Sequence, residues 1–420
     1  MTARTRLAGL GLCLVVAACR GQAPSPAPAA GAAAASGGGA CSVQVGLITT
    51  TATPAVQEQM NGMQLARDEV NAAGGLAGCQ VDLVIKDDAN LPETARGLAR
   101  ELAASPRLLA VFGTNSTAST MAALAVTERA AIPFIVPSVS GGLVTTMGYR
   151  WVFRLAAPET ALVAALFEFI ATLEARLDLR SIAVAYPLTV SGLSMFVAVE
   201  NQARTQGVSV VAAEEYPPNG GDFRAQLARV RRASPDMVFF DASPPDDAAA
   251  LMAQARELDL NPKLFLAITG PFVRPGFAKV GEYMIVGSQW TADAPWHDER
   301  GQTAPTFEAK YRDRFGVPPN IRAVSTYTSL FVVKRALEQA AGTSVEWSNI
   351  PAVRALLRTG LHAVDIPDTL FGPINFDQAG QNAHPVLLAQ IQKSAHVLIY
   401  PEALRLRSPI VPVPPWKERQ

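Results

Sequence analysis

Apolar residues follow two distinct spacings along this chain from residue 43 onward. Short unbroken apolar runs predict buried β-strands, whereas apolar residues three or four positions apart, as at Met60, Met63, Ala66 and Val70, predict amphipathic helices. The first expected strands are 43–49, 81–86, 108–112 and 132–136, with helices at 55–72, 92–104 and 116–130. A second series has helices at 160–177, 191–206, 223–233 and 245–258 and strands at 181–186, 208–214, 237–241 and 263–268.

This alternation of strand and helix indicates an α/β fold in which parallel sheets are covered by helices on both faces. Two series of similar size predict two Rossmann-like lobes. Residues 303–359 have a mostly helical pattern, and residues 371–400 alternate like short strands. Open α/β sheets bind ligands outside the carboxyl ends of their strands, so we expect a binding site in a cleft between the lobes.

The start of the chain has the pattern of an export signal. Arg4 and Arg6 precede an apolar stretch at 7–16, and Ala17 and Ala18 provide a small-residue cleavage site. Cys19 follows directly, as in a bacterial lipobox, where the cysteine thiol receives a lipid. We therefore expect residues 1–19 to be a lipoprotein signal peptide that leaves Cys19 lipidated. An ordinary signal peptide with a chance cysteine is the alternative.

Composition separates the next segment from the folded body. Residues 20–40 are Ala, Gly, Pro or Ser at 19 of 21 positions, which is typical of a flexible tether. The whole chain has 36 basic and 36 acidic residues, and the part after residue 40 has 33 and 36. A slightly acidic body argues against nucleic acid as a partner. We expect a lipid-anchored protein of the cell envelope, on the periplasmic or extracellular side of a membrane.

Two cysteines, Cys41 and Cys79, remain in the predicted body. Each precedes a predicted strand, and if these strands are parallel neighbours their starts lie close enough for a disulfide. An oxidising compartment outside the cytoplasm favours that bond. A pair of unlinked thiols is the alternative.

The sequence has no motif of a known catalytic or metal centre. It lacks a G-x-S-x-G elbow, an H-E-x-x-H pair and a phosphate-binding P-loop. The four histidines, His297, His362, His384 and His396, have no metal-ligand spacing. Asp87 and Asp88 end a predicted strand, and we interpret them as a turn rather than a metal or acid pair. We expect no enzyme activity, no metal and no cofactor.

Several short motifs follow one another in a fixed order along the body. They are Asn61-Gly62, DEVNAAGGLAG at 68–78, KDDA at 86–89, VFG at 111–113, Ile132-Pro133, Pro137-Ser138, GGDF at 220–223, SPD at 234–236, FGPINFD at 371–377 and Gly380-Gln381. In this order, over residues 43–400, the chain resembles the type I periplasmic binding proteins of the leucine/isoleucine/valine class, in a lipoprotein form.

The resemblance implies a particular division of the chain. Two lobes would be joined by a three-stranded hinge, with crossings near Ala157, Trp290 and Pro373. Lobe 1 would hold residues 41–157 plus 290–372, and lobe 2 would hold 158–289 plus 373–420. Ligand binding would close the hinge and trap the solute between the lobes.

Two polar loops of the first series form the expected binding wall. Residues 113–117 follow a strand and open a helix, so Asn115, Ser116 and Thr117 bring polar side chains and free N–H groups to a positive helix end that suits a carboxylate. Simple capping of the helix is the alternative. Ser138, Val139 and Ser140 lie in a similar loop after the next strand, and the hydroxyls of 49–53 lie at the same edge. The resemblance implies that Thr117, Ser138 and Ser140 hold the α-carboxylate and α-amino groups of an amino acid.

The second lobe departs from the leucine-binding pattern. The resemblance places two aromatic positions at Ser191 and Ser243 and an acidic position near Thr269, and none of these residues has the expected type. A ligand ammonium would then lack its carboxylate, and a buried unpaired charge is costly. Asp241 is the nearest substitute, with a capping or hinge-lining role as the alternative. We expect a solute other than a simple branched-chain amino acid, either larger or without a free ammonium.

Taken together, the chain is expected to be the solute-binding component of an ABC importer that binds an amino-acid-like or related organic solute. Its partners would be permease and ATPase subunits on separate chains, with membrane contact through the lipid anchor only, and the protein would be a monomer. A ligand-sensing or regulatory envelope lipoprotein with the same fold is the alternative.

Overall fold

A computed structural model of the chain describes residues 41–419, except for 53–56, 269, 275 and 343–344. The expected signal peptide, Cys19, the tether and Thr269 lie outside the described residues. Over the described part of the chain, every helix is too short or too polar to cross a membrane.

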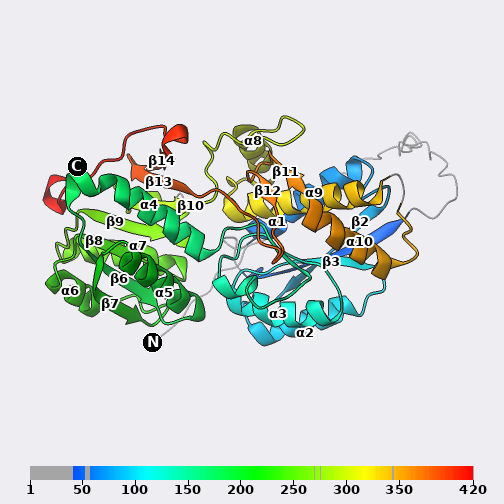
Figure 1. The fold of residues 1–420 in the computed structure, drawn as a ribbon, viewed down its shortest axis with the longest axis horizontal. Helices are drawn as coiled ribbons and strands as arrows, with labels where there is room; N and C mark the ends of the chain where they lie inside the picture. The colour runs from blue at the N-terminus through cyan, green and yellow to red at the C-terminus, as the bar shows by residue number, and fades with distance from the viewer. Residues whose placement is uncertain (1–40, 53–56, 269, 275, 343–344, 420) are drawn as a thin grey trace, which may run out of the picture. The chain divides into compact units, whose positions relative to one another are not determined.

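The first sheet has five parallel strands in the order β2-β1-β3-β4-β5. The strands are β1 (Ser42–Thr49), β2 (Gln80–Asp87), β3 (Leu108–Gly113), β4 (Phe134–Val136) and β5 (Val152–Arg154). Figure 1 shows α2 (Pro92–Ala103) and α3 (Thr117–Arg129) on one face and α1 (Glu58–Ala72), α9 (Ile321–Ala341) and α10 (Ile350–Ala363) on the other. Each face buries its own apolar core, as parallel sheets require. We call this sheet with its helices, including α8 (Ala304–Phe315), lobe 1.

The second sheet has seven strands in the order β14-β13-β10-β9-β8-β6-β7. The strands are β6 (Ser181–Pro187), β7 (Ser209–Tyr216), β8 (Met237–Phe240), β9 (Leu264–Ile268), β10 (Ile285–Ser288), β13 (Leu387–Gln392) and β14 (Ala395–Tyr400). The covering helices are α4 (Glu159–Leu177), α5 (Val190–Thr205), α6 (Arg224–Arg232) and α7 (Pro245–Glu257) (Figure 1). We call this part lobe 2.

The expectation of parallel sheets is confirmed for lobe 1 but is wrong for one edge of lobe 2. There β13 runs antiparallel to both β10 and β14. The turn between β13 and β14 consists of Lys393 and Ser394, with φ of 55° and 58°, and such a two-residue turn joins only antiparallel strands.

Three segments of the chain run between the lobes, and the first is hydrogen-bonded to the other two. The Ala157 N–H donates to Oε1 of Gln289, and Nε2 of Gln381 donates to the Ala156 carbonyl at 2.9 Å. Residues up to Asn382 still pair with lobe 1, where β11 (Asp365–Ile366) and β12 (Ile374–Asn375) form a short ladder. We therefore propose that the third crossing lies between residues 382 and 387, later than the expected position near Pro373.

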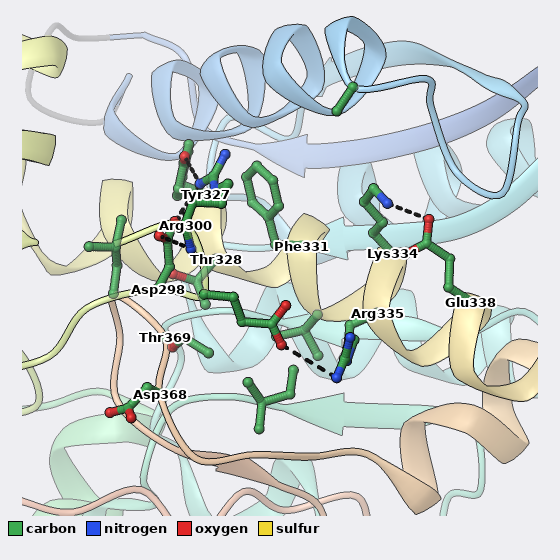
Figure 2. A pocket seen from close by; sticks show the side chains of 15 residues that line it. Asp298, Arg300, Tyr327, Thr328, Phe331, Lys334, Arg335, Glu338, Asp368 and Thr369 are labelled. Atoms are coloured by element: carbon green, nitrogen blue, oxygen red, sulfur yellow. Dashed lines mark hydrogen bonds and ion pairs between the residues drawn. The ribbon is translucent and has the colours of Figure 1, made fainter. Parts of the chain in front are cut away.

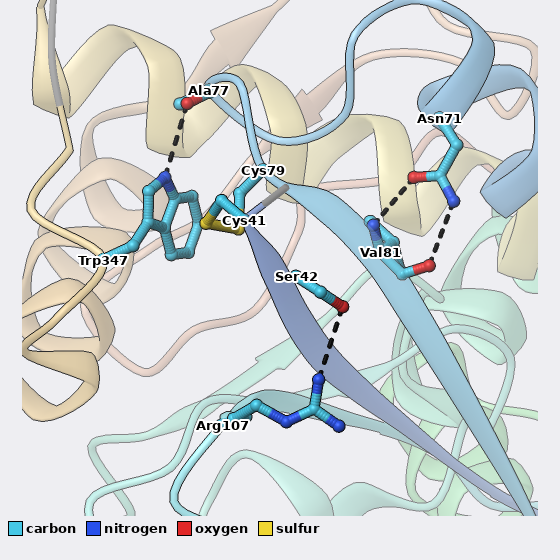
Figure 3. Close-up of a disulfide and its surroundings, with 8 residues drawn as sticks. All are labelled: Cys41, Ser42, Asn71, Ala77, Cys79, Val81, Arg107 and Trp347. Atoms are coloured by element: carbon cyan, nitrogen blue, oxygen red, sulfur yellow. Dashed lines mark hydrogen bonds between the residues drawn. A yellow bond between two sulfur atoms is a disulfide. The ribbon is translucent and has the colours of Figure 1, made fainter. Parts of the chain in front are cut away.

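The expected disulfide is confirmed. Figure 3 shows Cys41 bonded to Cys79, with their Cα atoms 4.7 Å apart. The register of β1 on β2 begins with Ser42 opposite Gln80, so the two residues just before these strands lie side by side. A cross-link over 38 residues stabilises the fold by about 4 kcal/mol, because it restricts the unfolded chain.

Candidate functional site

A cavity of about 340 Å³ lies between the lobes, at the carboxyl ends of strands from both sheets. Eight of the nine expected ligand-binding residues line it: Asn115, Ser116, Thr117, Ser138, Val139, Ser140, Ser191 and Ser243. The ninth, Thr269, lies outside the described residues, but its neighbours Gly270 and Pro271 line the same cavity. The structure therefore brings together loops from two distant parts of the sequence, as the strand pattern indicated.

The amino end of α3 forms one wall of the cavity. Ser116 is the N-cap residue, and its Oγ accepts a hydrogen bond from the Ser119 N–H at 3.3 Å. Nδ2 of Asn115 donates to Oγ1 of Thr49 at 2.8 Å, while its Oδ1 has no hydrogen-bond partner within the described part of the chain. Ser116 thus both caps the helix and lines the cavity. The helix end also presents N–H donors that suit an anionic oxygen.

A buried glutamine that the sequence analysis missed holds this wall in place. Gln59 is fully buried, and its Nε2 donates to Oγ of Ser138 at 3.1 Å and to the Thr114 carbonyl at 3.2 Å. Its Oε1 accepts a hydrogen bond from Oγ1 of Thr49 at 2.8 Å. One side chain from α1 therefore connects the end of β1 with the loops that follow β3 and β4.

The two loops of this wall also approach each other closely at Gly141. A Cβ atom at this position would lie 2.3 Å from Oγ1 of Thr117. Only glycine allows this spacing without displacing the threonine that lines the cavity.

Two carboxyl groups, those of Glu159 and Asp241, line the lobe 2 side. Glu159 accepts hydrogen bonds from the Gly142 N–H at 3.0 Å and from the Ser194 hydroxyl, and burial raises its pKa in spite of them. Burial also raises the pKa of Asp241 to about 7, and the nearby charge of Glu159 adds to the effect. Asp241 is therefore a poorly compensated acid at the cavity wall, consistent with its interpretation as the substitute acceptor for an amino group.

The protonation of Asp241 predicts a pH-dependent effect on stability. Its folded-state pKa of about 7 lies above the ordinary value of 3.8, so the folded protein holds this proton more tightly and loses stability as pH rises from about 4 to about 7. Asp241→Asn removes that loss. We expect the variant to raise the melting temperature by a few degrees at pH 8 and by much less at pH 4.

Calorimetric melting at both pH values checks this, with Asp313→Asn on the exposed face of α8 as the control. An equal shift of Asp241→Asn at pH 4 and pH 8 would show that the carboxyl group titrates normally.

Further parts of the cavity wall were not expected from the sequence. Besides Glu159, they include Asn90, Gln289, Arg274 and the segment 320–322. Asn320 caps α9, with its Oδ1 accepting from the Arg322 and Ala323 N–H groups, and an asparagine before a long apolar helix is a recognisable start signal. The two arginines carried no such signal, because their place at the cavity depends on the packing of one lobe against the other.

Asp87 is the last residue of β2, and Asp88 begins the turn that follows it. Oδ1 of Asp87 accepts from the Ala89 N–H at 2.8 Å, and Oδ1 of Asp88 accepts from Oγ1 of Thr50 at 2.9 Å and from the Asn90 N–H at 3.0 Å. These contacts agree with the interpretation as a strand-end turn. Within the described residues, no three His, Cys, Asp or Glu side chains gather as a metal site would require.

A second cavity, of about 290 Å³, lies within lobe 1 beside α9 (Figure 2). Its wall is largely apolar, with Phe331, Val332, Ile366 and Leu370. Most of its charged groups are already paired: Arg300 with Asp298 and Glu69, Lys334 with Glu338, and Arg335 with Glu299. None of the residues expected to bind ligand lies there, so we take the cavity between the lobes as the candidate site.

Comparisons with known proteins agree with this geometry. The sequence profile of the periplasmic binding proteins matches residues 42–396. The Leu/Ile/Val-binding protein homolog 8 of Brucella abortus (strain 2308) is 28% identical over 363 residues, which cover 82% of this chain and 86% of that protein.

Two solved structures show the same fold. An ABC transporter substrate-binding protein from Desulfitobacterium hafniense in complex with Leu has a TM-score of 0.71 at 20% identity, covering 85% of this chain and 100% of that one. A solute binding protein of an ABC transporter from R. palustris in complex with benzoate has a TM-score of 0.72 at 18% identity, covering 85% and 95%.

Proposed function

This chain belongs to the periplasmic binding protein family, and we propose that it is the extracytoplasmic solute-binding component of an ABC importer. The family binds solutes without transforming them, so the protein is not an enzyme. The observation that carries the proposal is the polar cavity between two α/β lobes, lined by eight of the nine expected residues. Closure of the lobes over a solute would present one defined conformation to permease subunits.

The proposed site holds a carboxylate of the solute at the amino end of α3. Oγ of Ser138 and the N–H groups near Ser116 and Thr117 would donate to it, as helix ends do for anions. An amino group, where the solute has one, would lie toward Asp241. Thr117, Ser138 and Ser140 would therefore hold the carboxylate and amino groups of the solute, as the family resemblance implies.

The lobe 2 wall supports a solute other than leucine, isoleucine or valine. Ser191 and Ser243 are exposed and line the cavity where the family resemblance places aromatic rings. Small hydroxyl side chains leave room and provide no apolar cover for a branched aliphatic group. The solved relatives named above hold Leu in one case and benzoate in the other, so one fold accommodates quite different organic acids.

Isothermal titration calorimetry tests this part of the proposal. We expect leucine, isoleucine and valine to show no binding at micromolar concentrations, because Ser191 and Ser243 give the lobe 2 wall no apolar cover for a branched side chain. A thermal-shift screen of amino acids, amides and aromatic acids should in turn reveal a solute that raises the melting temperature, since a ligand present at 100 times its Kd stabilises by about 2.7 kcal/mol. Micromolar binding of leucine would overturn the ligand assignment, and a screen without any stabilising solute would overturn the function.

The remaining partners follow from the same proposal. The lipobox supports a lipid anchor at Cys19 on the outer side of a membrane, with residues 20–40 as the tether. Permease and ATPase subunits would be separate chains, and the binding protein would act as a monomer. A sensor role on the same fold is less well supported, because the named relatives are binding proteins and the solved structures belong to ABC transporters.

A further inference from the structure

Two arginines from different lobes line the proposed cavity. Arg274 follows the short helix η3 (Gly270–Val273) of lobe 2, and Arg322 is the second residue of α9 in lobe 1. The charge of Arg274 is close enough to oppose that of Arg322. Two positively charged groups therefore meet at the wall of one cavity.

The two arginines differ in their partners. Glu58 of α1 lies 3.8 Å from the Arg274 guanidinium and forms an ion pair between the lobes. The backbone of Arg322 bonds within α9, whereas its guanidinium has no hydrogen bond or ion pair with any residue that the structure describes. Within the described part of the chain, the Arg322 guanidinium therefore reaches the cavity wall without a carboxylate in direct contact.

An uncompensated charge in a partly desolvated place is costly, and a bound anion removes that cost. A guanidinium carries five N–H donors in a planar fork that matches the two oxygens of a carboxylate. The N–H donors at the amino end of α3 already provide one binding site for an acidic group. The guanidinium of Arg322 provides a second, separate binding site.

We propose that the natural solute carries two acidic groups, one held at the amino end of α3 and the other held by Arg322, with Arg274 joining when the lobes close. The inference rests on the proposed function and narrows it to organic diacids, with or without an amino group. Asp241 and Glu159 line the same cavity and would repel an acid placed beside them, so the second acidic group lies away from them, toward Arg322.

The test compares solutes that differ by one acidic group. Glutarate with pentanoate, phthalate with benzoate, and L-glutamate with L-glutamine are screened by thermal shift on the purified full chain, and the strongest pair is measured by calorimetry. We expect the diacid of that pair to bind at least about 10-fold more tightly than its partner. Glutarate against L-glutamate then shows whether an amino group contributes.

Two variants assign the effect to Arg322. Arg322→Gln should weaken binding of the diacid roughly 10- to 100-fold and leave the single acid almost unchanged. Arg335→Gln, on the same helix but paired with Glu299 at 3.6 Å beside the other cavity, should change neither affinity. Melting of the ligand-free variants confirms that both are folded, and Arg322→Gln should not lower the melting temperature.

The inference is overturned if single acids bind as tightly as diacids, if Arg322→Gln weakens both members of a pair equally, or if only solutes without a second acidic group bind. In each of these cases the binding function itself stands. If no solute of any class raises the melting temperature, the proposed function fails and the inference fails with it.

Discussion

Replacement of Arg154 by methionine is expected to lower the free energy of unfolding by about 3 to 5 kcal/mol. The residue is only 1% exposed, at the end of β5, where the chain leaves lobe 1. Its guanidinium donates to Oε1 of Gln381 at 2.6 Å, to the Gly141 carbonyl at 2.5 Å and to Oγ1 of Thr145 at 3.0 Å. Methionine fills a similar volume but removes these three buried hydrogen bonds to a charged group, and Oε1 of Gln381 and the Gly141 carbonyl each keep only one longer bond, from Oγ1 of Thr145 and from the Val144 N–H, both at 3.2 Å.

The same change should reach the binding site. Gly141 lines the cavity, and the charge of Arg154 lowers the pKa of the buried Glu159 carboxyl, which burial otherwise raises. Without Arg154, the loop that contains Gly141 loses a hydrogen bond, and the Glu159 carboxylate loses a nearby positive charge. Denaturant unfolding of the purified protein measures the effect, with Arg150→Met as the exposed control on the same segment. Equal denaturation midpoints for the two variants would show that Arg154 does not stabilise the contact between the crossing near Ala157 and the loop that contains Gly141.

Replacement of Gly113 by alanine is expected to destabilise the protein by about 3 kcal/mol or more. Gly113 ends β3, the central strand of the first sheet, with a φ of 127° that side chains rarely allow. A Cβ atom there would lie 2.0 Å from the Ile48 carbonyl oxygen of β1. Either the strands separate or the loop 114–117 moves, so the affinity for any carboxylate solute should fall as well.

Gly97→Ala is the matched control for this prediction. Gly97 lies within α2, and a Cβ atom at this position would meet nothing within 4 Å. Alanine favours a helix interior, so this variant should gain about 0.5 to 1 kcal/mol. Similar stabilities of Gly113→Ala and Gly97→Ala in denaturant unfolding would contradict the close approach of β1 and β3.

Much of the architecture could be predicted because local patterns determine it. Apolar runs and helical spacings placed the major elements of both lobes, and the parallel pairing of β1 and β2 placed Cys41 beside Cys79. The polar loops after β3 and β4 were found because parallel strands bring their carboxyl ends to one edge.

Other features depend on contacts between distant residues and left no local signal. Strands β5 and β10 have only three and four residues, and neither follows an α-helix as the equally short β4 and β8 do, so the alternation of strand and helix did not indicate them. The role of Gln59 depends on the end of one strand and two loops that meet only in the folded sheet. In the sequence, Arg322 looks like an ordinary helix residue, because only the folded chain places it at the same cavity as Arg274 of lobe 2. The antiparallel edge of the second sheet was missed because the alternation at 371–400 does not specify a partner strand.

A crystal structure of the protein with the solute identified by the thermal-shift screen would show directly where that solute binds. We expect the solute to lie between the lobes, with an acidic group against Ser116, Thr117 and Ser138. Density for the solute in the lobe 1 cavity beside Phe331, or on the outer surface of either lobe, would contradict it.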